Sequence, residues 1–363
     1  MHAQTTAGSA IYVRRDTDST TVIAPRLHVN APVGDATHVD LVYTTDVWTS
    51  ASVDIRASAS RRLDGSQQPN EVVPVTEQRD EIDAAVSHEL DSVAVTGSYR
   101  YSHEPDYESH GGTLGASYSF ADKAATLELR LAGAFDRVGR AGDPNFHRPV
   151  RNLGARVGFT QVLDSQMFAQ VVYELMQAYG YNSSPYRFVG IGTNNGLCYD
   201  GGSTNTRCVP EVSPNERLRH AFGATLRRAL GEQVSFGLGY RFYLDSWDVM
   251  SHTAFGDLSW NVTHDLLVAL RYRFYMQTAA SHYQPTYDTS DFSREYFTND
   301  KELSAFMAHR VALDAEHRFV LDAPGHELDV ILSVAPSFFS YSNYRPLSSI
   351  SALEVTLATV FKL

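Results

Sequence analysis

Long segments with a strict two-residue alternation of side-chain character constrain the fold of this chain more than any other feature. One runs over Leu266–Gln277, where apolar residues at the even positions alternate with a second set that includes Arg271, Arg273 and Gln277; another runs over Leu353–Leu363. Successive side chains of a β-strand point to opposite faces, so each segment has one apolar and one wetter face. These segments are about twice as long as the usual strand of about 5–6 residues. That length is typical of tilted strands that cross a membrane.

The connections between these segments fall into two classes. Some are short turns and others are longer, more polar loops, and the two classes alternate along the chain. The short turns are Pro32–Thr37, Asp91–Ser92, Asp122–Ala124, Asp164–Gln166, Gly231–Gln233, His264–Asp265 and Asp322–Gly325. The longer loops are 53–76, 103–112, 139–150, 182–215, 246–252, 280–306 and 342–350. This arrangement predicts an all-β fold, a closed antiparallel transmembrane β-barrel with short periplasmic turns and longer extracellular loops.

The strand count depends on the N-terminal segment. Fifteen strands are clear from about Thr20 onward, and the first of them ends at a short turn. An even-stranded barrel with both termini in the periplasm needs one strand more, which Ser9–Arg15 supplies, with Asp16–Ser19 as a tight outer turn. We therefore expect about 16 strands, a tail at residues 1–8 and one barrel domain at 9–363.

Charge and hydropathy limit the compartment and the partners. The net charge of -12 argues against a nucleic-acid partner, because phosphate binding needs clustered cations. No run of about 18 apolar residues is present, which excludes transmembrane helices. Met1–Ala10 has neither a charged nor an apolar leader region, so the chain is either cytoplasmic or has lost a signal peptide. The strand pattern favours removal and predicts the bacterial outer membrane, with its lipid and lipopolysaccharide, as the location.

The charged residues expected inside the barrel are the first candidate site. The cations are almost all arginines, which form bidentate pairs with carboxylates. A charged pore lining is the functional interpretation, and cross-strand ion pairs that hold the interior together are the structural one. We expect Arg219, Arg241, Arg271 and Arg273 to share one wall. The predicted pore-lining residues are Arg130, Arg156, Arg217, Arg219, Arg227, Arg241, Arg271, Arg273, Arg310, Asp314, Glu316 and Arg318, and further inward acids are Asp40, Asp83, Glu128, Asp136, Glu174, Glu327 and Asp329.

A Tyr-Arg-Phe-Tyr sequence occurs twice in equivalent strands. By alternation its first and third residues face lipid, which predicts an aromatic girdle at the outer interface. The fourth residues, Tyr243 and Tyr275, would face inward, where stacking on a ligand is the alternative to a purely structural role. The girdle residues are Tyr240, Phe242, Tyr272 and Phe274.

The outer loops hold both cysteines and several histidines. Cys198 and Cys208 lie close together in the longest loop, and an exterior location predicts a disulfide between them. Scattered loop histidines could form a metal site, but no metal-binding spacing supports one, and we expect neither metal nor cofactor. The histidines concerned are His103, His110, His147, His252 and His282. The loop motifs Gly139–Phe146 and Asn299–Leu303 could narrow the pore, offer a docking surface, or serve only as turns.

Several stretches of this chain resemble one family of bacterial outer-membrane proteins, the domain of unknown function 3570. The stretches follow one another over nearly the whole chain. They are Thr45–Ile55, Thr76–Asp80, Val138–Phe146, Pro185–Arg187, Tyr240–Ser246, Ser251–Thr253, Tyr272–Tyr275, Gln277–His282 and Asn299–Phe306. The resemblance implies a secreted barrel whose gene neighbours often encode a thioredoxin-like protein, a small lipoprotein and a flavin transferase. It therefore implies extracytoplasmic redox work nearby but assigns no catalytic residue.

Three functions remain open at this point. A barrel of about 16 strands encloses an aqueous lumen unless something plugs it, which predicts a porin-like passive channel. The second hypothesis is a structural or docking barrel that holds a periplasmic, lipoprotein or extracellular partner, possibly a redox protein. An enzyme is the weakest hypothesis, because the sequence has no G-x-S-x-G, H-E-x-x-H or C-x-x-C motif. We therefore expect a protein that is not an enzyme and has no catalytic residues.

Overall fold

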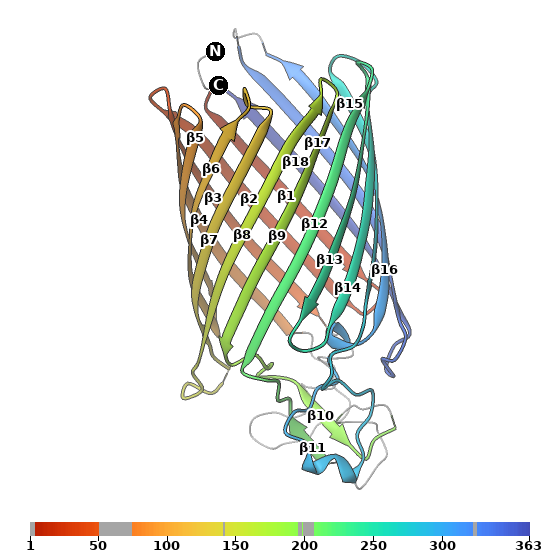
Figure 1. Ribbon diagram of the computed structural model, residues 1–363. Coiled ribbons are helices and arrows are strands. Elements are labelled where there is room, and N and C mark those ends of the chain that lie inside the picture. The colour runs from red at the N-terminus through yellow and green to blue at the C-terminus, as the bar shows by residue number, and fades with distance from the viewer. Residues whose placement is uncertain (1–3, 51–74, 141, 195–197, 199–206, 322–324) are drawn as a thin grey trace.

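The computed structural model describes residues 4–50, 75–140, 142–194, 198, 207–321 and 325–363. Sixteen of the described strands form one closed antiparallel barrel (Figure 1). Each strand pairs with the next in the chain, except that β12 follows β9 and β18 pairs with β1. The barrel strands are β1 (Thr6–Asp16), β2 (Thr20–Val33), β3 (Thr37–Ser50), β4 (Val75–Leu90), β5 (Val93–Glu104), β6 (Tyr107–Phe120), β7 (Ala125–Val138), β8 (Arg148–Asp164), β9 (Met167–Gly180), β12 (Glu216–Leu230), β13 (Val234–Asp245), β14 (Met250–Asn261), β15 (Leu266–Gln277), β16 (Phe306–Val320), β17 (Glu327–Tyr341) and β18 (Ser349–Lys362).

The N-terminal strand closes the barrel. On β1, Ile11 pairs with Leu357 of β18 on one side and with Pro25 of β2 on the other. Closure leaves no strand of the barrel with a free edge, so the backbone hydrogen bonds of the barrel sheet are satisfied within the membrane. The predicted strand Ser9–Arg15 and the count of 16 are therefore confirmed.

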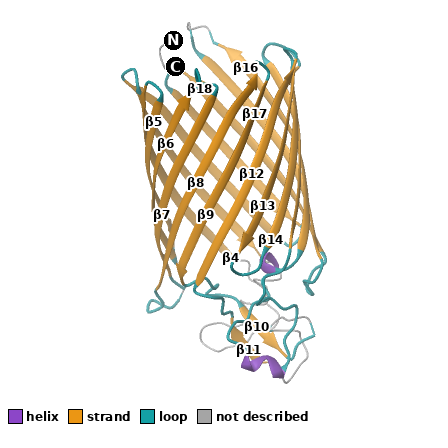
Figure 2. Cartoon of the chain, in the orientation of Figure 1, coloured by secondary structure: helices purple, strands orange, loops and turns teal. Residues whose placement is uncertain are grey.

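The two ends of the barrel differ as predicted. Both termini and the short turns lie at one end, the upper end in Figure 1. Gly34 and Gly231 occupy these turns with φ values of 75° and 79°, a left-handed conformation that costs glycine little. The long connections lie at the opposite end, which we call the extracellular end (Figure 2).

One of the expected outer loops has a different structure. The segment 103–112 is a tight hairpin rather than a longer loop, because β5 and β6 continue pairing beyond Ser102 and Ser109 to Glu104 and Tyr107. Polar residues continue a strand as well as apolar ones where the strand rises above the bilayer, so composition alone misplaced this turn. The expected loop at 53–76 lies almost entirely outside the described residues.

The outer face of the barrel carries a band of exposed apolar side chains. Leu114 is 71% exposed, Phe135 64% and Leu27 57%. Every barrel strand carries exposed apolar side chains of this kind. Water-soluble proteins rarely expose contiguous apolar surface of this extent, whereas a membrane-spanning barrel requires it. Within the described ranges, no helix has the length and hydropathy needed to cross a bilayer.

A small folded unit extends from the extracellular end. It comprises the described residues of 181–215 and 278–305, and we call it the extracellular cap. Its elements are β10 (Phe188–Ile191), β11 (Arg207–Pro210) and the short 3-10 helices η1 (Thr289–Ser293) and η2 (Lys301–Leu303). Figure 1 shows β10 and β11 beyond the lower ends of β12 and β13. Isolated bridges such as Ile191–Tyr287 and Val212–Phe297 join the two segments.

Candidate functional site

Alternation places the predicted lumen arginines on the inner face of the barrel. Leu238 and Tyr240 on β13 are 56% and 47% exposed on the outer face, so Arg241 between Tyr240 and Phe242 points inward. The same argument applies to Arg130, Arg156 and Arg271, each of which lies next to a residue of the exposed apolar band. Most of the predicted inward residues contact a residue of opposite charge.

Five of these side chains form a continuous charged chain across four strands. Glu128 on β7 contacts Arg130 at 3.4 Å and Arg156 at 2.6 Å. Glu174 on β9 contacts Arg156 at 3.6 Å and Arg241 at 2.8 Å. Each carboxylate therefore bridges two guanidinium groups, and the chain carries three positive and two negative charges. These charges lie on the consecutive strands β7, β8 and β9 and on β13, so they occupy one side of the lumen.

Other predicted residues form separate inward pairs. Three of these pairs join adjacent strands, and two, Arg227–Asp257 and Arg310–Glu354, reach across an intervening strand. The pairs are Arg227–Asp257 at 2.8 Å, Arg271–Asp314 at 3.1 Å, Arg310–Glu354 at 3.0 Å, Arg318–Asp329 at 3.2 Å and Lys362–Asp329 at 2.9 Å. Cross-strand ion pairs, which the structural interpretation of the inward charges predicted, are thus present in the barrel.

Two predicted arginines differ from the rest. Arg219 and Arg273 have no carboxylate within 4.0 Å among the described residues. Arg273 lies 6.0 Å from the ring centre of Tyr275 on its own strand. Glu316, also in the predicted set, lies on β16, with its Cα facing that of Ile331. Arg219, Arg241, Arg271 and Arg273 lie on β12, β13 and β15, so the structure places them on one wall.

Glycines provide the space that these inward pairs need. Gly237 on β13 lies between Arg227 on β12 and Asp257 on β14 in the strand register. A Cβ atom at Gly237 would lie 3.1 Å from Arg227 Nη2 and even nearer to Asp257, so a side chain there would disrupt the pair. The ion pair therefore bridges over the middle strand because that strand has a glycine at this position.

Two hollows of the inner wall are lined entirely by described residues. One has a volume of about 310 Å³ and lies between β4 and β9; the other has about 180 Å³ and lies between β8 and β14. Arg156 and Glu174 line both, so their ion pair forms the ridge between the hollows. The wall is therefore not smooth, and a solute in the lumen would meet defined recesses.

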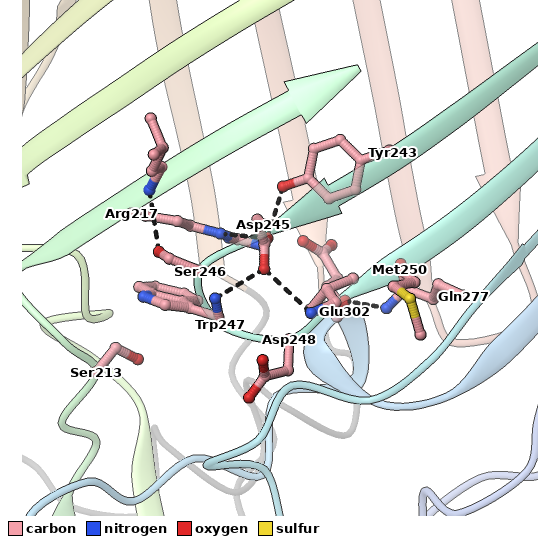
Figure 3. Close-up of polar contacts among 12 residues, drawn as sticks. Ser213, Arg217, Tyr243, Asp245, Ser246, Trp247, Asp248, Met250, Gln277 and Glu302 are labelled. Atoms are coloured by element: carbon pink, nitrogen blue, oxygen red, sulfur yellow. Dashed lines mark hydrogen bonds and ion pairs between the residues drawn. The ribbon is translucent and has the colours of Figure 1, made fainter. Parts of the chain in front are cut away.

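Asp245 organises the junction between the barrel rim and the cap (Figure 3). Its buried carboxylate accepts hydrogen bonds from Arg217 Nε at 2.8 Å and from the Tyr243 hydroxyl at 2.6 Å. It also accepts from the backbone N–H groups of Trp247 at 2.9 Å and Val249 at 3.1 Å. Arg217 is engaged twice, since its guanidinium lies 4.1 Å from a ring centre of Trp247. Arg217 and Tyr243 thus help to fix the rim rather than line an open lumen.

The cap has its own buried core. Val189, Ile191, Tyr287 and Phe297 form one apolar cluster, and Trp247, Val249, Ala280, Tyr283 and Leu303 form another at the rim. Glu211 is buried beside the first cluster, where it accepts hydrogen bonds from Ser184 N–H at 2.7 Å and Thr298 Oγ1 at 2.6 Å. His282 is buried against the edge of the Trp247 ring at 5.0 Å. Burial and the nearby Arg217 charge lower the pKa of His282 to about 4.

Polar contacts fasten the cap to distant parts of the rim. The Tyr186 hydroxyl donates to Asp106 in the β5–β6 turn. Lys301 Nζ lies 3.0 Å from Asp18 in the β1–β2 turn. Within the cap, Arg187 Nη1 lies 2.6 Å from Asp300 and joins the two cap segments. Lys301 and Asp300 belong to the Asn299–Leu303 motif. The two cap segments arise at β9–β12 and β15–β16, so these contacts carry the cap across the barrel mouth.

The predicted outer girdle contains a repeated Tyr–His pair that the sequence did not reveal. The Tyr240 hydroxyl lies 2.6 Å from His252 Nδ1, and the Tyr272 hydroxyl lies 2.8 Å from His309 Nδ1. In each pair the histidine lies opposite the residue two positions after the tyrosine, which is Phe242 or Phe274 in these two. The same diagonal arrangement occurs at Tyr99–His110 (2.7 Å) and Tyr173–His220 (2.9 Å). The sequence signal that could have revealed these pairs is an outward-facing tyrosine on one strand and an outward-facing histidine on the adjacent strand.

The structure does not support the predicted loop disulfide, and it shows the contacts of the Gly139–Phe146 motif. The Cys198–Cys208 disulfide is not supported: the Cys208 thiol lies 3.3 Å from the backbone oxygen of Cys198, in a hydrogen bond rather than a sulfur–sulfur bond. Closeness in an exterior loop was therefore not sufficient to predict a bond; Cys208 lies on β11, opposite Gly190 of β10. In the Gly139–Phe146 motif, Phe146 lies between Arg140 and Arg148, at 4.7 and 4.8 Å from the two guanidinium carbons.

The loop histidines do not converge. His110 and His252 are on the outer face, whereas His282 is inside the cap. In the part of the chain that the structure describes, no three metal-binding side chains of the usual types gather around one point.

Comparison with known structures shows an outer-membrane barrel fold. A bacterial polysaccharide outer membrane secretin matches with a TM-score of 0.51 and 8% identity, over 100% of this chain and 99% of its own. OccK1 (OpdK) from Pseudomonas aeruginosa matches with a TM-score of 0.46 and 11% identity, over 99% and 98%. The siderophore receptor PirA from Pseudomonas aeruginosa matches with a TM-score of 0.47 and 9% identity. This match covers 99% of this chain but only 62% of the receptor. At these identities the likeness concerns the fold.

Comparison at the sequence level identifies a family. No curated protein matches this chain significantly. A family model, described as a protein of unknown function (DUF3570), matches residues 3–152 and 147–333. These ranges contain all of the motifs on which the family resemblance rested, and they cover the barrel from β1 into β17. The chain is therefore an outer-membrane β-barrel that belongs to the DUF3570 family.

Proposed function

We propose that this barrel is a passive, porin-like channel whose inward arginines set its ion preference. The observation that carries the proposal is the water exposure of charged side chains on the inner wall. The Arg227 side chain is 47% exposed and that of Arg271 60%, although both are ion-paired. A lumen can conduct ions only if it contains water, and exposed charges inside a closed barrel of 16 strands are in contact with such water.

In this proposal the wall of Arg219, Arg241, Arg271 and Arg273 biases permeation. Fixed charges in a narrow aqueous lumen act on passing ions over a Debye length of about 8 Å at physiological salt. Arg241 and Arg271 are partly neutralised by Glu174 and Asp314, whereas Arg219 and Arg273 have no such carboxylate among the described residues. We therefore attribute the largest share of the bias to Arg219 and Arg273.

Reversal potentials across a salt gradient in planar bilayers test the proposal. The barrel should conduct, and replacing Arg219, Arg241, Arg271 and Arg273 by Ser should shift the reversal potential toward cation preference. Arg219→Ser with Arg273→Ser alone should give most of the shift. Heat-modifiable gel mobility checks that each variant is folded. An unchanged reversal potential would exclude this wall as the selectivity element, and a wild-type barrel that does not conduct would exclude the channel.

The extracellular cap favours a second candidate, a barrel that docks a partner. A segment whose only task is to connect β9 with β12 needs no buried apolar cluster, yet the cap has one around Ile191 and Tyr287. Such a folded surface could hold an extracellular partner. A non-conducting barrel from which cap-disrupting substitutions remove a copurifying protein would favour this candidate. In both candidates the protein is not an enzyme, and its outer face contacts membrane lipid and lipopolysaccharide.

A further inference from the structure

The larger hollow of the inner wall has the features of a ligand site. Its volume is about 310 Å³, enough for a small organic molecule. Glycines and alanines from β6, β7 and β8 form its floor, and Met176 closes one side. The floor therefore consists mainly of small apolar residues, and Thr113 and Asn152 also line the hollow. Its charged lining residues are Asp83, Arg100, Arg130, Arg156 and Glu174.

Arg100 lies at one end of this hollow with its guanidinium uncommitted. Asp83 is its partner in the β4–β5 register, yet no carboxylate among the described residues lies within 4.0 Å of Arg100. Instead the guanidinium lies over Gly111 on β6, with Nη2 3.7 Å from the position that a Cβ atom would take there. Gly111 thus lets Arg100 lie along the wall beside the hollow.

Arg130 and Arg156 lie at the other end, opposite each other on β7 and β8. Glu128 and Glu174 engage Arg156 from both sides. Arg130 has one contact, 3.4 Å to Glu128, and its side chain is 50% exposed. Most of the N–H donors of Arg130 therefore face water, as do those of Arg100.

The two available guanidinium groups are separated along the wall. Arg100 pairs with Gly111 on β6 and Arg130 pairs with Gly115, four residues further along the same strand. At about 3.3 Å per residue this offset is about 13 Å. A cation therefore marks each end of an apolar floor, which matches a molecule with an anionic group at each end.

We propose that this hollow binds small aliphatic dicarboxylates, with one carboxylate on Arg100 and the other on Arg130. Guanidinium groups form charge-assisted hydrogen bonds with carboxylates, and the methylene chain would lie on the glycine and alanine floor. The inference deepens the proposed channel function by naming the class of solute that the lumen retains. It does not require conduction, since a closed barrel with a solvated lumen would bind the same ligand.

Equilibrium binding to the folded, detergent-solubilised barrel tests this site. Three probes share a four-carbon chain: succinate, butyrate and 4-aminobutyrate. Calorimetry or ligand-observed NMR should show succinate binding about tenfold more tightly than butyrate, because one more charge-assisted contact forms. Arg100→Ser and Arg130→Ser should each weaken succinate binding about tenfold and bring it near that of butyrate.

Arg26→Ser is the matched control. Arg26 is an exposed arginine on the inner face of β2, away from the hollow, and no ion pair of it occurs among the described residues. Arg26→Ser removes one positive charge from the lumen, as Arg100→Ser and Arg130→Ser do, but it should leave succinate binding unchanged. The proposal fails if the folded barrel does not bind succinate, if Arg26→Ser weakens binding as much as Arg100→Ser, or if 4-aminobutyrate binds more tightly than succinate. The last result would assign the hollow to zwitterions that use Asp83. Succinate binding to a non-conducting barrel would refute the channel and keep the site.

Discussion

The barrel wall and the extracellular cap are stabilised in opposite ways. In the wall, a closed ladder of backbone hydrogen bonds carries the structure, and ion pairs such as Arg227–Asp257 are half exposed to water. In the cap, only four residues pair on each strand, and a few buried side chains such as Glu211 and Thr298 hold two distant segments together. Loss of one side chain should therefore matter little in the wall and much in the cap.

The strongest expected contrast comes from Glu211→Ala. Removing this carboxylate leaves the Ser184 N–H and the Thr298 hydroxyl without this acceptor and takes one carboxylate from Arg187. Breaking a buried, hydrogen-bonded ion pair costs about 3–5 kcal/mol. Limited proteolysis of reconstituted protein should then cut the cap while the heat-modifiable barrel persists. Glu232→Ala, in an exposed turn at the other end, is the control, and equal protease resistance of both variants would contradict the contrast.

Acid should open the cap through His282. Its pKa is lowered to about 4 in the folded cap, against about 6.5 when unfolded, so the unfolded cap binds more protons between these values. Stability of the cap is therefore full above about pH 6.5 and falls as the pH drops toward 4, by about 3 kcal/mol at most. Protease sensitivity measured against pH should show this loss. His282→Gln does not titrate, so its profile should be flatter, and identical profiles would exclude His282.

In the wall, the Tyr–His girdle should give a smaller effect. Tyr240→Phe removes one hydroxyl that lies 2.6 Å from His252 Nδ1, for a loss of about 1 kcal/mol. The four pairs lie on separate strand pairs, so replacing Tyr99, Tyr173, Tyr240 and Tyr272 together should give nearly additive losses. Urea unfolding in lipid vesicles measures them. A loss from one pair that equals the loss from all four would show that the girdle acts as a single unit.

The smallest effect should come from an inward ion pair. Arg227→Ser removes a pair whose arginine is 47% exposed, and such pairs contribute about 0–1 kcal/mol. Gly237→Ala is the informative companion, because its Cβ would collide with Asp257 and force the pair apart. Urea unfolding should show similar small losses for the two variants. A loss of several kcal/mol for Arg227→Ser would show that the wall, like the cap, depends on single side chains.

Prediction from sequence succeeded where one physical rule repeats. Alternation located β15 and β18, since each barrel strand must satisfy lipid on one face and water on the other. The need for an even number of strands then located the closing strand near Ile11. Prediction failed where that rule stops. Beyond the membrane, Ser102 and Glu104 continue a strand through polar residues, and the sequence was interpreted there as a loop.

The candidate site divides in the same way. The inward direction of Arg241 and Arg271 followed from parity alone, but their partners Glu174 and Asp314 did not. A partner depends on strand register and on which intervening residue is small, as Ala221 and Gly223 on β12 show between Glu174 and Arg241. The cap was not foreseen at all, because its core joins residues such as Ile191 and Tyr287 across two separate loops.

The sequence by itself determined the barrel, its strand number, its orientation of short and long connections and the inner and outer faces of its wall. These follow from a local period of two residues, which every strand repeats in response to the same two solvents. Only the tertiary structure decided which charges pair, where the wall is hollow, how tyrosines meet histidines and how the cap crosses the mouth. Such features depend on the distance between residues far apart in the chain, and no local pattern encodes that distance.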